Sequence, residues 1–332
     1  MRRDCPPDGG LDDISDTELT AEGGEDLAAN RVRMGRPGVV GAGRDRFGLT
    51  GTSQAFDPRV VAIRPDLADI AVAGQHFAPH YAAPMMASCI LPSAVLRGAP
   101  SLDADQTSEL LFGEAFALLD VTGGWAWGYC LADHYVGYLA ADALGAPIAP
   151  SHRVAAAEAI LHSTPDAAAG ATAILPRGAL VMGSTEGAWL ATAHGYLPLA
   201  ALVEAGTANG DPAGIAEALT GAPYLWGGRT ANGIDCSGLV QLAWAAAGIQ
   251  LPRDSDLQFG ALGPDKDIAP GDLARGDLVF FPGHVGIMVD DRNIIHASRR
   301  WMAVQTEPLA DVIARSAAKD HDPPVRGYKR LK

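Results

Sequence analysis

The spacing of apolar and polar positions predicts short strands in the first half of the chain. Within residues 89–144, apolar side chains alternate with polar ones between turns that contain glycine. Trp125, Trp127 and Tyr129, for example, fall on one face directly after Gly123-Gly124. Such period-two alternation is typical of half-buried strands. Several short strands at close spacing favour a small β-barrel.

The same pattern recurs weakly in the next segment. Glu186-Gly187-Ala188-Trp189-Leu190 echoes the turn at Gly123-Gly124, and Gly195-Tyr196-Leu197-Pro198 echoes Val136-Gly137-Tyr138-Leu139. The period of about 60 residues is the size of a small domain. We therefore expect two barrels. The tryptophans are read as barrel core and not as a ligand-binding surface.

Three segments flank the barrels. Residues 1–55 are rich in Gly, Asp and Arg and are expected to be disordered or loosely ordered. In the lead-in to the first barrel, residues 59–63 suggest a strand and residues 66–73 a short helix. A glycine-containing linker at 204–211 precedes the C-terminal domain. The expected boundaries are 56–147 for the lead-in and first barrel, 148–205 for the second barrel, and 208–332 for the last domain.

Cys236 stands where a helix is predicted to begin. The turn Asp235-Cys236-Ser237-Gly238 is followed by apolar residues at helical spacing until Gly248. Free N–H groups and the helix dipole are expected to lower the pKa of a thiol at this position. The alternative is a buried structural cysteine, which is common.

Two histidines flank a predicted hairpin. His284 begins one apolar run and His296 ends the next, with turn residues around Asp290 between them. A hairpin centred on Asp290 places the two histidines opposite each other, about 5 Å apart at Cβ. His284 could then pair with the Cys236 thiolate while His296 orients its ring.

Charge and cysteine usage narrow the function classes. The 332 residues carry a net charge of −14, which argues against nucleic acid as the main partner. With Cys236 set aside, three cysteines remain, an odd number that fits a reducing compartment. We see no secretory signal and no run long enough to span a membrane. The expected location is therefore the cytoplasm, with no membrane partner; protein partners and the oligomeric state are left open.

Six motifs follow in order between residues 208 and 331. They are Pro223-Tyr224-Leu225-Trp226-Gly227-Gly228, Asp235-Cys236-Ser237-Gly238-Leu239-Val240, Leu251-Pro252-Arg253-Asp254-Ser255 with Gln258, Gly276-Asp277-Leu278-Val279-Phe280-Phe281, His284-Val285-Gly286-Ile287, and Ile295-His296-Ala297. This ordered set resembles the NlpC/P60 family of papain-like cysteine peptidases. The two barrels resemble bacterial SH3-like (SH3b) domains. The fold expected from the resemblance is two small SH3-like β-barrels followed by a papain-like α+β domain.

The resemblance implies an activity and roles for single residues. The family hydrolyses cell-wall peptides, usually at the bond between γ-D-glutamate and a diamino acid. It implies Cys236 as nucleophile, His284 as base and His296 as the orienting third residue, with no cofactor or metal. It also places the Tyr224 hydroxyl near the oxyanion, although the sequence alone allows a core aromatic there.

The first barrel resembles the variant found in cytoplasmic γ-D-glutamyl-L-diamino acid endopeptidases. In those members an Asp-Ser pair binds the free amine of an N-terminal L-Ala, and the resemblance gives this role to Asp254 and Ser255. The residues alone also allow a helix cap at this position. Tyr135 matches a tyrosine of that pocket, and either Glu109 or Glu114 matches its glutamate. The implied substrate is a murein tri- or tetrapeptide with a free N-terminus, cut during cell-wall peptide recycling.

Three alternatives stay open at this point. The first is an exported hydrolase with the same chemistry that cuts intact wall. The second is an inactive SH3b module that binds the wall. The third is a zinc site made from Cys236, His284 and His296, which lacks the C-x-x-C spacing of common zinc sites.

Overall fold

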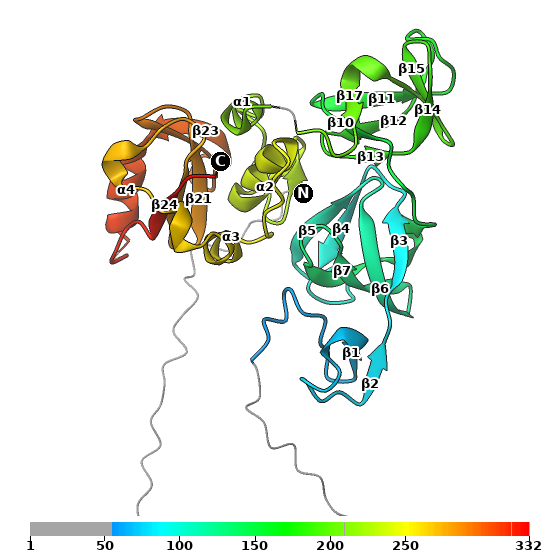
Figure 1. Ribbon diagram of the computed structural model, residues 1–332, viewed down its shortest axis with the longest axis horizontal. Coiled ribbons are helices and arrows are strands. Elements are labelled where there is room, and N and C mark those ends of the chain that lie inside the picture. The colour runs from blue at the N-terminus through cyan, green and yellow to red at the C-terminus, as the bar shows by residue number, and fades with distance from the viewer. Residues whose placement is uncertain (1–54, 209, 320, 332) are drawn as a thin grey trace, which may run out of the picture. The chain divides into compact units, whose positions relative to one another are not determined.

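The computed structural model describes residues 55–208, 210–319 and 321–331 (Figure 1), which belong to one compact unit. Apart from Ala55, the predicted N-terminal tail lies outside these residues. The lead-in segment differs from its prediction: residues 59–63 form a turn and not a strand, and the helix predicted at 66–73 is replaced by a short strand followed by a 3-10 helix. Pro58 and Pro65 interrupt this segment and lack the N–H groups that a ladder or helix uses. Its elements are β1 (Leu67–Asp69), the 3-10 helix η1 (Ile70–Val72) and β2 (His80–Ala82).

The first β domain is a seven-stranded sheet in the order β5-β4-β8-β7-β6-β3-β9. Its core contains Leu96, Leu110, Phe116 and Leu139, all fully buried. The turn between β6 and β7 has two residues, Gly123-Gly124, and both have positive φ, as a tight hairpin requires. The elements are β3 (Met85–Cys89), β4 (Ser93–Arg97), β5 (Gln106–Leu111), β6 (Ala115–Thr122), β7 (Trp125–Cys130), β8 (Val136–Ala140), η2 (Ala141–Ala143) and β9 (Leu144–Gly145).

The second β domain repeats the element order of the first. In both, a hairpin with a two-residue turn is followed by a strand, a 3-10 helix and a short last strand. Whether the second domain is also SH3-like stays a prediction, as do all the domain boundaries. Its elements are β10 (His152–Val154), β11 (Glu158–His162), β12 (Ala171–Pro176), β13 (Leu180–Val181), β14 (Gly183–Glu186), β15 (Trp189–Thr192), β16 (Gly195–Pro198), η3 (Leu199–Ala201) and β17 (Leu202–Glu204).

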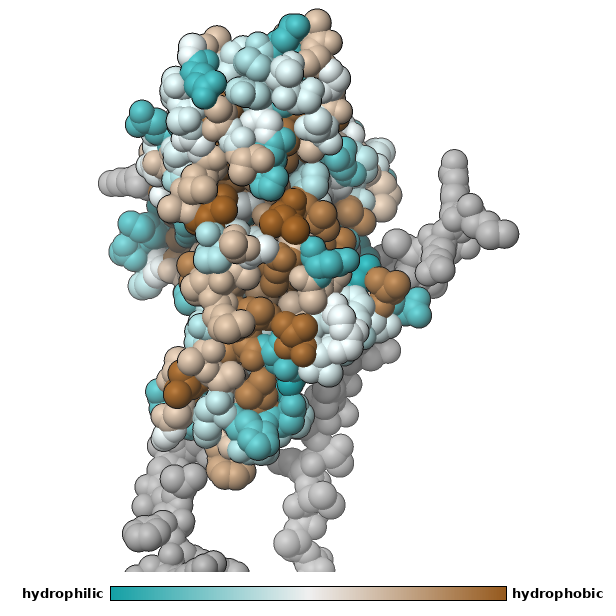
Figure 2. Space-filling model, turned by 90° about the vertical axis from the view of Figure 1, so that its right-hand side faces the viewer, coloured by the Kyte–Doolittle hydropathy of each residue, from teal (hydrophilic) through white to brown (hydrophobic). Residues whose placement is uncertain are grey.

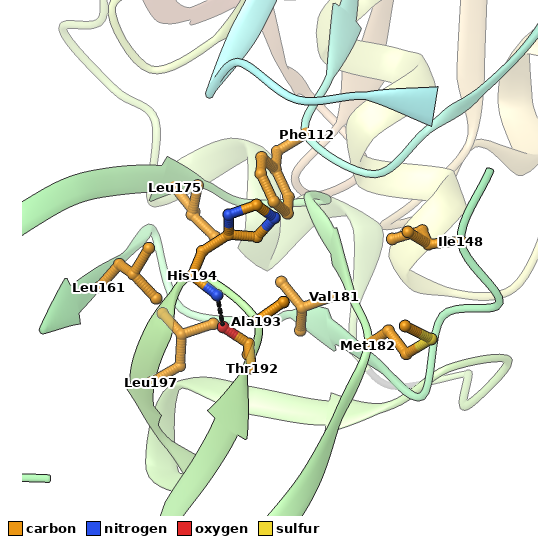
Figure 3. Close-up of a pocket in the computed structure, with 10 residues that line it drawn as sticks. All are labelled: Phe112, Ile148, Leu161, Leu175, Val181, Met182, Thr192, Ala193, His194 and Leu197. Carbon is orange, nitrogen blue, oxygen red and sulfur yellow. Dashed lines mark hydrogen bonds between the residues drawn. The ribbon is translucent and has the colours of Figure 1, made fainter. Parts of the chain in front are cut away.

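A small apolar cavity lies where the two β domains meet (Figure 3). Phe112, in the turn after β5, packs there edge-to-face against His194, with ring centroids 5.7 Å apart. The Phe112 carbonyl also accepts a hydrogen bond from Leu180 N. None of the predicted site residues lines this cavity, so we interpret it as packing between the domains. The other lining residues are Ile148, Leu161, Leu175, Val181, Met182, Thr192, Ala193 and Leu197.

Large apolar side chains are also exposed on the β domains, and Figure 2 shows hydrophobic surface on the face that it presents. Single exposed apolar residues are common on proteins, so they indicate no ligand by themselves. They are Met85, Met86, Ile90, Leu91, Ile160, Ile174 and Met182.

The C-terminal domain is built on an antiparallel sheet in the order β23-β22-β21-β20-β24. Helices α1 and α2 cover one face, and α4 covers the other (Figure 1). The elements are α1 (Pro212–Glu217), β18 (Arg229–Thr230), β19 (Gly233–Ile234), α2 (Cys236–Ala246), α3 (Ser255–Ala261), η4 (Pro264–Lys266), η5 (Pro270–Asp272), β20 (Leu278–Phe281), β21 (His284–Met288), β22 (Asn293–Ser298), β23 (Ala303–Pro308), α4 (Leu309–Ala317) and β24 (Gly327–Lys329).

The hairpin between β21 and β22 has a different register from the predicted one. Ile287 pairs with Ile295, so the hairpin is centred on Asp291 and not on Asp290. The cause is the Asp290 side chain, which accepts hydrogen bonds from the backbone N–H groups of Arg292 and Asn293. The register moves by two residues, an even number, so His284 and His296 still lie on the same face.

Helix α2 is almost entirely buried against the sheet. Its first turn packs so closely on the preceding loop that a Cβ on Gly238 would lie only 2.4 Å from the Gly228 carbonyl oxygen. Glycine at position 238 therefore fixes how near the first turn of α2 comes to that loop. In the part of the chain that the structure describes, no helix has both the length and the apolar character needed to cross a bilayer.

Candidate active site

Cys236 occupies the first position of α2, as predicted. Asp235 caps the helix, with its Oδ1 accepting a hydrogen bond from Gly238 N at 2.8 Å. Cys236 is 8% exposed, and the backbone N–H of Val285 acts to lower the pKa of its thiol. Because Val285 follows His284, the start of α2 lies beside the start of β21.

The two histidines meet as the sequence predicts. His284 Nε2 lies 2.7 Å from His296 Nδ1. His296 Nε2 lies 2.8 Å from Oε2 of Glu307 in β23, a residue that the sequence reasoning missed. Since His284 and His296 bond directly to each other, those nitrogens do not converge on a shared cation. Among the described residues, no group of three or more His, Cys, Asp or Glu is placed to hold a metal ion.

The charge state of the thiol differs from the sequence expectation. Burial, followed by the Asp235 carboxylate, raises the pKa of Cys236 to about 12. Burial, with His296, Lys319 and Arg315, lowers the pKa of His284 to about 3. Helix N-terminal N–H groups favour a thiolate, but here desolvation outweighs them. The free site therefore holds a thiol beside a neutral imidazole.

Tyr224 is buried, and its backbone pairs with that of Ile234, two residues before Cys236. Burial raises the pKa of Tyr224 well above its usual value, and Cys236 and Asp235 raise it further. The phenol therefore stays protonated and remains a hydrogen-bond donor beside Cys236. This is the property that an oxyanion-binding group needs.

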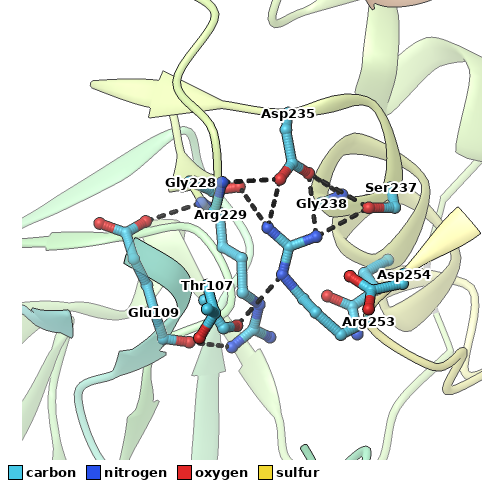
Figure 4. A network of polar contacts seen from close by, with 12 residues as sticks. Thr107, Glu109, Gly228, Arg229, Asp235, Ser237, Gly238, Arg253 and Asp254 are labelled. Carbon is cyan, nitrogen blue, oxygen red and sulfur yellow. Dashed lines mark hydrogen bonds and ion pairs between the residues drawn. The ribbon is translucent and has the colours of Figure 1, made fainter. Parts of the chain in front are cut away.

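A buried arginine supports the first turn of α2, and its burial could not be predicted from the sequence (Figure 4). Arg253 is 1% exposed and pairs with both carboxylate oxygens of Asp235, at 2.9 and 2.5 Å. Its guanidinium also donates to Ser237 Oγ at 2.8 Å and to Ser108 Oγ of β5 at 3.1 Å. Arg253 thus connects the first turn of α2 to the first β domain.

Asp254 and Tyr135 come together as predicted, and a third residue joins them. The Tyr135 hydroxyl donates to Asp254 Oδ2 at 3.0 Å, and Arg59 NH1 donates to the same oxygen at 2.8 Å. Asp254 precedes α3 but makes no side-chain capping bond. Its carboxylate therefore faces the first β domain and the lead-in segment, while Ser255 begins the helix.

The two candidate glutamates have other partners. The Glu114 carboxylate binds Leu111 N and the guanidinium of Arg229, so it holds its own turn. Glu109 is buried and accepts a hydrogen bond from Arg229 N at 2.7 Å. Figure 4 shows the Glu109 carboxylate on the opposite side of Arg253 from Asp254. The structure thus joins Tyr135 to Asp254 by a hydrogen bond, whereas among the described residues no hydrogen bond joins either glutamate to them.

Comparisons with known proteins match two segments of the chain. Residues 221–319 match the NlpC/P60 family, and residues 96–144 match the bacterial dipeptidyl-peptidase SH3 domain. Dipeptidyl-peptidase 6 of Lysinibacillus sphaericus is 42% identical over 76 residues, covering 23% of this chain and 27% of that protein. A γ-D-glutamyl-L-lysine dipeptidyl-peptidase of Bacillus cereus is 36% identical over 98 residues, covering 27% and 28%.

The fold also matches a solved structure. The crystal structure of an NlpC/P60 family protein from Bacillus cereus superposes with a TM-score of 0.62 at 19% identity, covering 74% of this chain and 99% of that one. The chain spans less than a third of the length of the curated relatives named above. The matched segments and the shared fold show that residues 221–319 form a domain that matches the NlpC/P60 family, and that residues 96–144 match a bacterial dipeptidyl-peptidase SH3 domain.

Proposed function

We propose that this protein hydrolyses the bond between γ-D-glutamate and a diamino acid in murein peptides that begin with a free L-Ala. The observation behind the proposal is the contact between Tyr135 of the SH3 domain and Asp254 of the peptidase domain. A carboxylate held there beside the catalytic helix suits an ammonium group. The name of the Bacillus cereus relative points to the same bond.

The proposed reaction is acyl transfer to Cys236 followed by hydrolysis. As the thiol attacks the γ-carbonyl carbon, its proton moves to His284, because the free site holds a thiol and a neutral imidazole. His284 then protonates the amine of the departing diamino acid, leaving a thioester on Cys236. Water, deprotonated by His284, releases the dipeptide and restores the thiol.

We expect Tyr224→Phe to lower kcat about 100-fold with little change in KM. The variant keeps the buried ring but loses the hydroxyl beside Cys236, and removal of one oxyanion donor typically costs about 10²–10³-fold in kcat. Steady-state kinetics on the tripeptide measures this effect. The control is Tyr328→Phe, because Tyr328 belongs to β24 and is far in the sequence from Cys236 in α2. This variant should keep the wild-type rate. A wild-type kcat in Tyr224→Phe would make Tyr224 a core aromatic only.

The proposed site for the substrate amine, formed by Asp254, Tyr135 and Arg59 and called the amine pocket below, has one carboxylate oxygen that accepts no hydrogen bond from the described residues. Tyr135 and Arg59 both bind Oδ2 of Asp254, and within the described residues no hydrogen bond to its Oδ1 is formed. Arg59 also binds Asp256 and Asp57, so three carboxylates surround one guanidinium. This excess of negative charge favours a second cation, which the substrate ammonium would supply.

We expect Asp254→Asn to lower kcat/KM for the free tripeptide about thirtyfold or more, because an amide keeps the shape but removes the charge that pairs with the ammonium. Discrimination against the N-acetylated peptide should shrink. Both peptides are compared by mass spectrometry. Asp256→Asn is the matched control: it contacts the same Arg59 but is exposed and does not touch Tyr135. Unchanged preference in Asp254→Asn would remove the amine pocket from the proposal.

One experiment tests the proposed function as a whole. Purified protein is incubated with L-Ala-γ-D-Glu-diaminopimelate, with its N-acetylated form and with intact sacculi. Cleavage of the free peptide alone supports a recycling enzyme, for which we propose a cytoplasmic location. Release of fragments from sacculi would instead support the exported hydrolase, and cell fractionation would then decide the location.

A further inference from the structure

Glu307 is the last member of a hydrogen-bonded chain that begins at His284. Its carboxylate is 11% exposed and accepts from His296 Nε2 at 2.8 Å and from Arg315 NH2 at 2.6 Å. Burial by itself would raise the pKa of Glu307, but His296, Trp301 and Arg315 outweigh it and the pKa is lowered. Glu307 is therefore ionised and can only accept hydrogen bonds.

This acceptor fixes which nitrogens of the two histidines bear protons. Burial keeps His296 neutral by lowering its pKa, so its ring has a single N–H. That proton must be on Nε2, which faces the carboxylate, and Nδ1 is then an acceptor. His284 Nε2 must in turn donate to His296 Nδ1. The bare nitrogen of His284 is Nδ1, the one available to the Cys236 thiol.

The same carboxylate sets the charge balance when His284 takes up a proton. The charged groups that act on the two imidazoles are Glu307 from β23, Arg315 from α4, and Lys319 from the residues after α4. Arg315 and Lys319 are cations, which destabilise a protonated His284 by repulsion. Glu307 is the anion that offsets this repulsion, and it binds His296 directly.

We propose that Glu307 is a positioning residue of the catalytic site, which fixes the tautomers of His296 and His284 and stabilises the imidazolium that forms when Cys236 loses its proton. The proposal rests on the proposed function for its role in turnover. Its effect on the thiol itself exists without any substrate, which allows a separate test.

The test is the pH dependence of Cys236 alkylation by iodoacetamide, followed by mass spectrometry. The free site holds a thiol and a neutral imidazole, so alkylation proceeds through the small fraction of molecules in which the proton has moved from Cys236 to His284. In Glu307→Gln this thiolate–imidazolium form is less stable. We therefore expect alkylation at pH 7 to slow about tenfold and the pH–rate profile to move up by about one pH unit, the usual effect of one nearby charge. Glu307→Asp keeps the charge, so its alkylation rate should lie between those of wild type and Glu307→Gln. Glu217→Gln, an exposed glutamate paired with Arg275, is the matched control and should behave as wild type.

Nitrogen-15 spectra of histidine-labelled protein supply the second readout. Wild type should show His284 and His296 both protonated at Nε2, and Glu307→Ala should show mixed tautomers. If both the tautomers and the alkylation profile of the Glu307 variants match wild type, the inference is wrong. If those effects occur but wild type cleaves none of the three peptidoglycan substrates, the proposed function alone is wrong.

Discussion

Cys236→Ala is expected to lower the rate of peptide cleavage by about 10⁴-fold or more while the protein stays folded. The change removes the sulfur that would form the thioester, and loss of a nucleophile leaves only the contribution of binding and oxyanion contacts. Alanine is a good helix former and fits the first turn of α2, so the fold should not change. Cleavage of the tripeptide and the circular dichroism spectrum are the two measurements.

The other two cysteines that the structure describes provide the control for this prediction. Cys89 and Cys130 belong to the first β domain and are 1% and 3% exposed, whereas Cys236 is 8% exposed. Cys89→Ala should therefore retain activity, and iodoacetamide should label Cys236 before Cys89 and Cys130. Rapid labelling of Cys89 or Cys130 with Cys236 unreactive would contradict the assignment of the nucleophile.

Arg253→Met is expected to lower the free energy of unfolding by about 3–5 kcal/mol and to abolish cleavage. Methionine fills much of the space but leaves the Asp235 carboxylate buried without its partner, which is the expensive way to break a buried ion pair. The first turn of α2, with Cys236, would lose its support from β5. Denaturant unfolding followed by fluorescence measures the stability.

Two further variants separate the buried pair from a general effect of losing an arginine. Arg275→Met removes an exposed pair with Asp211 and Glu217 and should cost less than about 1 kcal/mol. The double variant Arg253→Met with Asp235→Asn removes both buried charges and should be more stable than Arg253→Met alone. Equal stability of Arg253→Met and Arg275→Met would show that the buried pair contributes little.

The sequence alone was sufficient for features that depend on local spacing. Asp235 before an apolar helical run gave the start of α2 and placed Cys236 in its first turn. The positions of His284 and His296 differ by an even number, so any even change of register leaves both on one face. The predicted contact was therefore correct although the predicted pairing was not.

Tertiary structure alone decided which partners these residues have. Asp254 has the position of a helix cap, yet its carboxylate binds Arg59, 195 residues earlier in the chain. Nothing in the sequence indicates that Arg253 is buried. The pKa of the Cys236 thiol is raised by desolvation, which outweighs the lowering expected at a helix N-terminus. Glu307 meets His296 only because β22 and β23 pair in the observed register. Periodicity fixes which way a side chain points on its own element, whereas its partners and its desolvation depend on how distant elements pack.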